Sequence, residues 1–197
     1  MKRLILWTSI AVAMSAGMAS AVEWQAEEVT RTYPVSGATG IALYESIGAN
    51  GPKSGDRRTI AHTTFSLKWS RKYEPQAGGA CRLVSAKPFL TITYTLPAVK
   101  GVLQGEVRTR WETFSSGIRR HELTHGDIIK DMVTQILETT VGLTVDDDPQ
   151  CRKIRKVIEE PLKAASLRQR ERSRAFDQDE MSNGGAVHQL ILALVNG

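Results

Sequence analysis

A long helical period after Gly105 is the sequence feature that most limits the folds open to this chain. Apolar side chains recur there at steps of three and four, the spacing of one face of an α-helix, and two histidines fall within the same stripe. The stripe consists of Trp111, Phe114, Ile118, His121, His125, Ile129, Met132 and Ile136. Gly142 is a suitable stop, because glycine accepts the left-handed conformation common at helix ends. The pattern predicts one long helix whose buried face packs on the rest of the protein.

Before residue 100 the chain has the two-residue period of β-strands. Residues 64–69 and 90–96 alternate polar and apolar side chains. The first run places its apolar residues on one face: Phe65, Leu67 and Trp69. We expect Pro97 to end the second run, because proline cannot donate to a central ladder. Residues 22–100 are therefore predicted to form a small antiparallel sheet.

The segments after the long helix read as further helices. A polar loop ending at Pro149 leads into a helix from about Gln150 that is restarted or kinked at Pro161. Residues 176–185 read as a glycine-rich loop, and residues 186–195 as a buried closing helix.

The two halves predict an α+β fold in one domain of ordinary size, residues 22–197. It is mainly β over residues 22–100 and mainly α over residues 105–197. We expect the sheet to pack on the long helix, with the later helices closing the site that this helix carries.

Residues 1–21 have the layout of a secretory signal peptide. Lys2 and Arg3 precede an apolar run, and the small residues 19–21 provide a cleavage site after Ala21. A membrane span needs about 20 successive apolar residues, whereas polar residues interrupt this run and no later segment is long and apolar enough. The sequence predicts a periplasmic or secreted protein with no stable membrane insertion after signal cleavage.

The charge of the chain is mildly basic. Loss of Lys2 and Arg3 with the signal lowers the formal net charge from +5 to +3. Basic runs at residues 152–156 and 168–174 read as the solvated sides of helices, and no aromatic residues interleave with them for stacking on bases. We therefore expect no nucleic-acid partner.

Two cysteines, Cys81 and Cys151, predict one disulfide. Export to an oxidising compartment makes a pair of cysteines most simply a bridge. Closing so long a loop stabilises the fold by about 4 kcal/mol according to the chain-entropy model. Metal ligation by the cysteines is the weaker alternative, because neither has a second cysteine or a histidine at finger-like spacing.

The helical stripe contains the sequence HELTH at residues 121–125. Successive helical residues turn by about 100°, so His121 and His125 point about 40° apart and lie one turn from each other. Two such imidazoles can bind zinc while a third ligand comes from elsewhere and a water takes the open position. Glu122 lies on the adjoining flank, where it can take the proton of that water as the water attacks a carbonyl carbon.

This motif predicts a zinc-dependent amide hydrolase, with His121 and His125 as ligands and Glu122 as general base. Imidazole and carboxylate ligands also suit cobalt, nickel or iron. Two histidines on one face can also be ordinary residues, since a pattern of three fixed positions arises by chance in roughly one protein in a hundred. The stripe faces the interior, however, where unpartnered imidazoles are costly to bury, and this favours the metal site.

The third ligand lies outside the motif, and we select Glu180, because a carboxylate commonly completes a two-histidine zinc site. Asp131 has the offset of a ligand six residues after the second histidine, but Ile128 replaces the glycine that would turn the chain back. His62 is expected to face solvent, and His188 to be a satisfied buried histidine. The alternatives to Glu180 are Asp177, Asp179, Asp131, His188 and His62.

Other short segments accompany HELTH along nearly all of the mature chain. They are YPVSG at 33–37, GP at 51–52, Thr64-Phe65 with Trp69, Thr95-Leu96-Pro97, Trp111, the two cysteines and Phe176-Asp177. In this order they resemble a bacterial family of uncharacterised secreted proteins that are predicted to be zinc-dependent proteases. The resemblance implies a zincin-like fold, zinc bound by His121 and His125, and Glu122 as the base.

The resemblance differs near the C-terminus. Family members often carry a tyrosine and an aspartate followed by a histidine, where this chain has Phe176, Asp177 and Glu180. Either Glu180 replaces that histidine, or the site is degenerate.

The sequence thus predicts a secreted or periplasmic zinc metallopeptidase that acts on a peptide or protein substrate. Two alternatives stay open: a catalytically inactive zincin-fold binding or structural protein of the cell envelope, and an amidase acting on peptidoglycan. No pattern in the chain indicates an oligomeric state.

Overall fold

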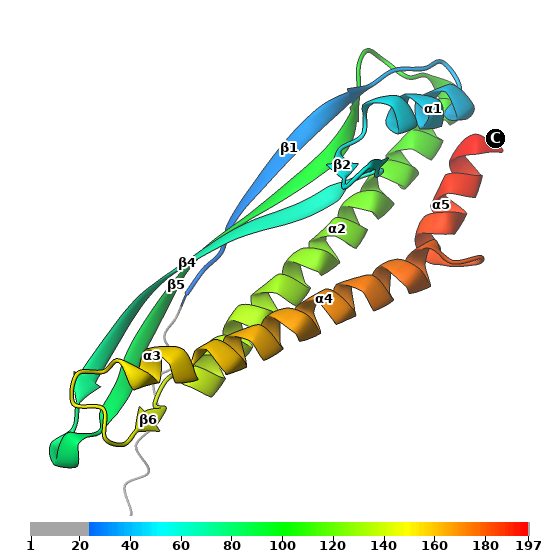
Figure 1. Cartoon of the computed structure of the whole chain (residues 1–197). Helices are drawn as coiled ribbons and strands as arrows, with labels where there is room; N and C mark the ends of the chain where they lie inside the picture. Colours follow the sequence, from blue (N-terminus) through cyan, green and yellow to red (C-terminus); the bar gives the residue numbers. More distant parts are fainter. Residues whose placement is uncertain (1–23, 197) are drawn as a thin grey trace, which may run out of the picture.

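A computed structural model describes residues 24–196 of the protein (Figure 1), so the predicted signal peptide lies outside the described residues. In chain order the elements are β1 (Glu27–Val35), α1 (Gly40–Asn50), β2 (Lys53–Ser54), β3 (Arg57–Arg58), β4 (His62–Pro75), the 3-10 turn η1 (Ala77–Gly79), β5 (Cys81–Val99), α2 (Gly105–Thr140), β6 (Thr144–Val145), α3 (Lys153–Val157), α4 (Glu159–Met181) and α5 (Ala186–Val195). The predicted fold class, α+β, is confirmed.

The main sheet is mixed, which corrects the prediction of an antiparallel sheet. β5 is the central strand, with β1 on one side and β4 on the other. β4 pairs with β5 in antiparallel fashion, but β1 pairs with it in parallel. Because α1, the β2–β3 hairpin and β4 lie between β1 and β5 in the chain, the polypeptide can return in the same direction before β5 begins. Strand alternation carries no information on this direction.

β5 continues past Pro97 to Val99, which corrects the prediction that Pro97 ends the strand. Pairing with β4 stops at His62 opposite Thr95, so only β1 flanks β5 beside Pro97. Beyond Thr95 no β4 residue pairs with this edge of β5, so the missing N–H of Pro97 removes no hydrogen bond to β4.

The long helix predicted from the stripe is confirmed as α2, which has 36 residues and is therefore about 54 Å long. Every stripe residue is buried except His125, which is half-buried. Gly142 follows the helix with a φ of 91°, as predicted for the stop. Side chains of the sheet such as Ile92 and Tyr94 share one core with Phe114 and Ile118 of α2. Burial of each such side chain is worth about 1.5–3 kcal/mol relative to exposure.

α4 runs along α2 in the opposite direction (Figure 1). An ion pair joins Asp131 to Arg172, and a hydrogen bond joins Gln135 to Arg168. Residue numbers therefore increase along α2 as they decrease along α4, so the two helices are antiparallel. The helix break lies at Ile158, three residues before the predicted kink. Pro161 sits in the first turn of α4, where its lack of an N–H breaks no helical bond.

α4 extends to Met181, although residues 176–185 were expected to form a loop. Residues 176–181 lack a clear apolar period, yet they are compatible with a helix and follow directly on the preceding turns. Gly184, with a φ of 89°, lies in the turn that leads into α5. α5 itself occupies the predicted residues 186–195.

α1 was not predicted. Its signals are the cap at Thr39, whose hydroxyl accepts the N–H of Ala42, and the buried pair Leu43 and Ile47 four residues apart. Glycines around this short segment make it resemble a turn.

The predicted disulfide between Cys81 and Cys151 is confirmed. It belongs to a second apolar cluster with Leu83, Ile154 and Ile158. Within residues 24–196, no helix has the length and apolar character needed to cross a bilayer.

Candidate metal centre

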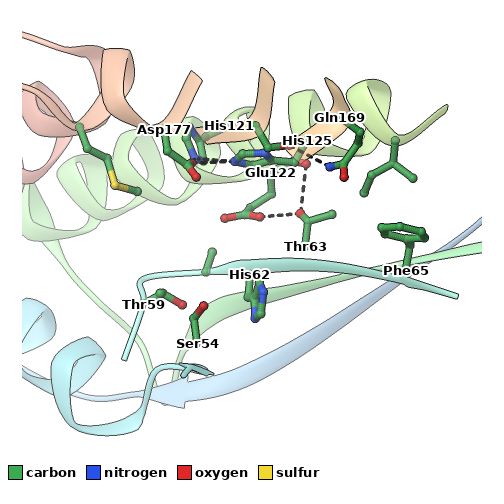
Figure 2. A pocket seen from close by; sticks show the side chains of 14 residues that line it. Ser54, Thr59, His62, Thr63, Phe65, His121, Glu122, His125, Gln169 and Asp177 are labelled. Carbon is green, nitrogen blue, oxygen red and sulfur yellow. Dashed lines mark hydrogen bonds and ion pairs between the residues drawn. The ribbon is translucent and has the colours of Figure 1, made fainter. Parts of the chain in front are cut away.

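Three side chains converge where α4 crosses the histidine turn of α2 (Figure 2). Oδ1 of Asp177 lies 2.8 Å from Nε2 of His125 and 3.1 Å from Nε2 of His121. The two Nε2 atoms lie 3.2 Å apart. Within residues 24–196, these three form the one group of three or more histidine, cysteine or acidic side chains that could hold a metal ion.

The separations of the three atoms suit a shared metal. Ligands of one tetrahedral zinc, at about 2.0–2.1 Å from the ion, lie about 3.3 Å from one another. The donors, two imidazole nitrogens and one carboxylate oxygen, are a set that zinc binds. The side chain of His121 is 3 % exposed and that of His125 is 12 %, whereas Asp177 is 44 % exposed. The histidines therefore form the inner wall of the site, and Asp177 lies at its mouth.

Two helices and an aromatic ring hold this arrangement. Spacing of four residues places both histidines on one face of α2. Phe176 of α4 stacks on the ring of His121, with centroids 4.7 Å apart and planes 20° apart, and meets His125 edge-on at 5.4 Å. The stacked ring limits rotation of the imidazoles, while the next residue, Asp177, supplies the carboxylate.

Glu122 points away from the three-residue cluster toward β4 (Figure 2). The hydroxyl of Thr63 donates to Oε2 of Glu122 over 2.5 Å and lies 3.2 Å from the backbone carbonyl of the same residue. Burial raises the pKa of Glu122; the Thr63 hydrogen bond and the histidines oppose this shift, but the net direction is upward. A carboxyl with a raised pKa is suited to exchange protons nearer neutral pH.

Charges in the cluster oppose the effects of burial. Burial lowers the pKa of His121, but the hydrogen bond to Asp177 and the neighbouring carboxylates raise it overall. Burial raises the pKa of Asp177, yet both imidazoles hold that pKa well below its usual range. Asp177 is accordingly ionised at neutral pH, the state in which a carboxylate binds a metal.

A pocket of about 350 Å³ opens onto the cluster between β4 and α4. Its lining comprises Ser54, Thr59, Ala61, His62, Thr63, Phe65, His121, Glu122, His125, Ile129, Gln169, Ser173, Asp177 and Met181. Glu122 and both histidines thus face a cavity large enough for part of a substrate.

The cluster differs from the predicted ligand set at one position, because Asp177 occupies the place expected for Glu180. Asp177 and Glu180 are three residues apart, so they lie on one face of α4, about 60° apart around the helix axis and nearly one turn from each other along it. Oε2 of Glu180 lies 3.7 Å from Nδ1 of His121, the nitrogen on the far side of the ring from the cluster.

The other candidates lie elsewhere. Asp131 pairs with Arg172, away from the histidines as expected, and Asp179 is exposed. Nδ1 of His188 accepts the backbone N–H of Gly184 over 3.2 Å in a half-buried position. His62 lines the pocket, which corrects the expectation that it faces only solvent.

Thr63 and Phe176 were not assigned roles from the sequence. Thr63 has the strand parity of Phe65 and Leu67, so extending that face by one step would have placed it toward the helices. The contact of Phe176 with the imidazoles carries no local signal, because it depends on how α4 packs on α2.

Comparison of the chain with known protein families supports one part of the resemblance, namely membership of a bacterial family without an assigned function. No curated protein and no solved structure matches this chain. One family model, described as a bacterial protein of unknown function (DUF922), matches residues 30–185, and the chain therefore belongs to that family.

Proposed function

We propose that this protein is an exported zinc metallopeptidase whose centre is formed by His121, His125 and Asp177. The observation that carries the proposal is the convergence of two imidazole nitrogens and an ionised carboxylate beside a buried glutamate in one pocket. Each part is found in metallohydrolases, and together they provide ligands, a base and space for a substrate.

The chemistry follows from the positions of these groups. A zinc ion held by the three residues would act as a Lewis acid and lower the pKa of a bound water. Glu122, one residue from His121, takes the proton of the attacking water and passes it to the leaving amine. Thr63 holds the carboxylate of Glu122 on the β4 side of the pocket, so the base keeps one orientation between the two transfers.

The disulfide supports the exported location in this proposal. Such bridges persist in oxidising compartments and are rare in the bacterial cytosol. A periplasmic or secreted site of action agrees with the signal peptide predicted for residues 1–21.

The decisive experiment measures zinc per chain by elemental analysis, together with hydrolysis of an unfolded protein and of muropeptides. We expect about one zinc per chain and cleavage of the unfolded protein that a chelator abolishes and zinc restores. Cleavage of muropeptides alone would indicate a peptidoglycan amidase. Zinc without any turnover would indicate a metal-containing binding protein, and neither zinc nor turnover would refute the proposal.

A further inference from the structure

The second nitrogen of His121 has no hydrogen-bond partner among the described residues. Nδ1 of this ring is buried, although most buried polar atoms in proteins are paired. Nε2 points into the cluster, and an imidazole that ligates a metal through Nε2 carries its proton on Nδ1. A buried N–H at Nδ1 requires an acceptor.

Glu180 is the side chain placed to accept it. Its Oε2 lies 3.7 Å from Nδ1, slightly beyond hydrogen-bond range. A glutamate has three rotatable side-chain bonds, so a small rotation shortens this separation without movement of α4. The neighbouring Asp179 is exposed on the same helix and makes no such approach.

The surroundings favour a fixed contact. The Glu180 side chain is 27 % exposed, and Phe176, one turn earlier on α4, covers the face of the His121 ring. With one face covered and Nε2 turned toward Asp177, rotation of the ring is restricted and Nδ1 stays directed toward Glu180.

We propose that Glu180 accepts the Nδ1 hydrogen of His121 and is the positioning residue of the metal centre, while Asp177 is its third ligand. The inference rests on the proposed zinc site. Such an acceptor selects the tautomer with a free Nε2, orients the ring and makes the nitrogen a stronger ligand. Helix α4 then supplies both the third ligand, Asp177, and the acceptor, Glu180, that orients His121 of α2.

The test compares zinc binding by the parent, Glu180→Ala, Asp177→Ala and the matched control Asp179→Ala, by competition with a chromogenic chelator. Loss of an outer hydrogen-bond partner weakens metal affinity about 10- to 100-fold. We expect Glu180→Ala to keep one zinc per chain with affinity weakened by that factor, and Asp179→Ala to match the parent. Asp177→Ala should weaken binding further, because it removes a ligand.

Two further measurements separate positioning from loss of folding. Glu180→Gln retains an acceptor oxygen, so its affinity should lie between those of the parent and Glu180→Ala. Long-range ¹H–¹⁵N spectra of the zinc-loaded parent should show a protonated Nδ1 on His121 whose hydrogen resonance moves upfield in Glu180→Ala.

The outcomes distinguish this inference from the proposed function. Zinc bound equally well by the parent, Glu180→Ala and Asp179→Ala would overturn the positioning role and leave the peptidase proposal intact. Loss of stoichiometric zinc in Glu180→Ala, with Asp177→Ala unaffected, would make Glu180 the ligand and overturn the inference. A parent that binds no zinc would overturn both.

Discussion

Single residues decide the chemistry proposed for this protein. Glu122 is 5 % exposed and lies beside both histidines, with one hydroxyl partner in Thr63. Conversion to glutamine preserves shape and hydrogen bonding while removing the ability to take a proton. The roles of ligand and base can therefore be tested separately.

We predict that Glu122→Gln keeps about one zinc per chain but lowers kcat for an unfolded protein substrate by about 10²–10⁴, the usual contribution of a general base. Glu138→Gln is the control, because Glu138 is exposed on the same helix. Steady-state kinetics on the three proteins measure the effect. Equal turnover by Glu122→Gln and the parent would exclude Glu122 as the base.

A second residue-scale prediction concerns stability in acid. Asp148 is 3 % exposed, and its carboxylate accepts the backbone N–H groups of Arg152, Lys153 and Ile154 at 2.7–3.0 Å. Burial raises the pKa of this carboxyl, but the three N–H groups together lower it below the ordinary value of 3.8. Because the folded pKa lies below the unfolded pKa, the contribution is present above pH 3.8 and is lost as the pH falls through the folded pKa.

Asp148→Asn should therefore have a lower Tm than the parent at pH 7, and the difference should shrink as the pH is lowered below about 4. Thermal melts followed by circular dichroism at several pH values measure this. Asp146→Asn, which changes an exposed carboxyl in the same loop, is the control. A difference in Tm that stays constant down to pH 2 would show that the ionised carboxylate is not what stabilises the loop.

At the scale of elements, close helix contacts place the parts of the fold. The start of α1 meets the end of α5: a Cβ at Gly40 would overlap the carbonyl oxygen of Leu194, whereas a Cβ at Gly48 of the same helix would meet no described atom within 4 Å. Backbone on the other side of the contact cannot rotate aside as a side chain can. A methyl group added at Gly40 is therefore expected to overlap backbone of α5, whereas one added at Gly48 has free space.

We predict that Gly40→Ala lowers the free energy of unfolding by about 1–3 kcal/mol through overpacking. Gly48→Ala should raise it by about 0.5–1 kcal/mol, because alanine is the better helix former. Urea denaturation of both variants and the parent provides the comparison. If the two substitutions have the same effect, α1 does not pack on α5 as closely as described.

At the scale of the whole molecule, the disulfide joins the sheet to the helical half. Cys81 begins β5, and Cys151 precedes α3, 70 residues later. This end of the molecule, with β6 and α3, lies opposite the end formed by α1 and α5 (Figure 1). The cysteines share an apolar cluster with Leu83 that is separate from the core containing the α2 stripe.

Replacement of both cysteines by alanine should lower the free energy of unfolding by about 4 kcal/mol. Without the bridge the unfolded chain is no longer closed into a loop, so its conformational entropy rises and the unfolded state becomes more favourable. The folded variant should still bind zinc, because the disulfide cluster shares no residue with the metal centre. Denaturation of the parent with and without reductant measures the effect, and the double variant, which reductant cannot alter, is the control. Equal stability of the parent in both conditions would mean that the bridge constrains little.

The sequence alone was sufficient for the features that depend on local spacing. The apolar period predicted α2, the four-residue interval put His121 and His125 on one face, and a lone pair of cysteines predicted the bridge. Each of these follows from the geometry of a single element or from counting, so no knowledge of packing was required.

Only the tertiary structure decided which residues from other elements reach the histidines. Antiparallel packing of α4 on α2 brings Asp177 to the two Nε2 atoms and Glu180 to Nδ1, whereas the sequence favoured Glu180 as the ligand and kept Asp177 as an alternative. The packing of α2 on the sheet brings Thr63 to Glu122. The parallel course of β1 beside β5 was likewise decided by the path of the chain between them. These relations depend on crossing positions and rotations of whole elements, which the summed contacts of the core determine and no short stretch of sequence encodes.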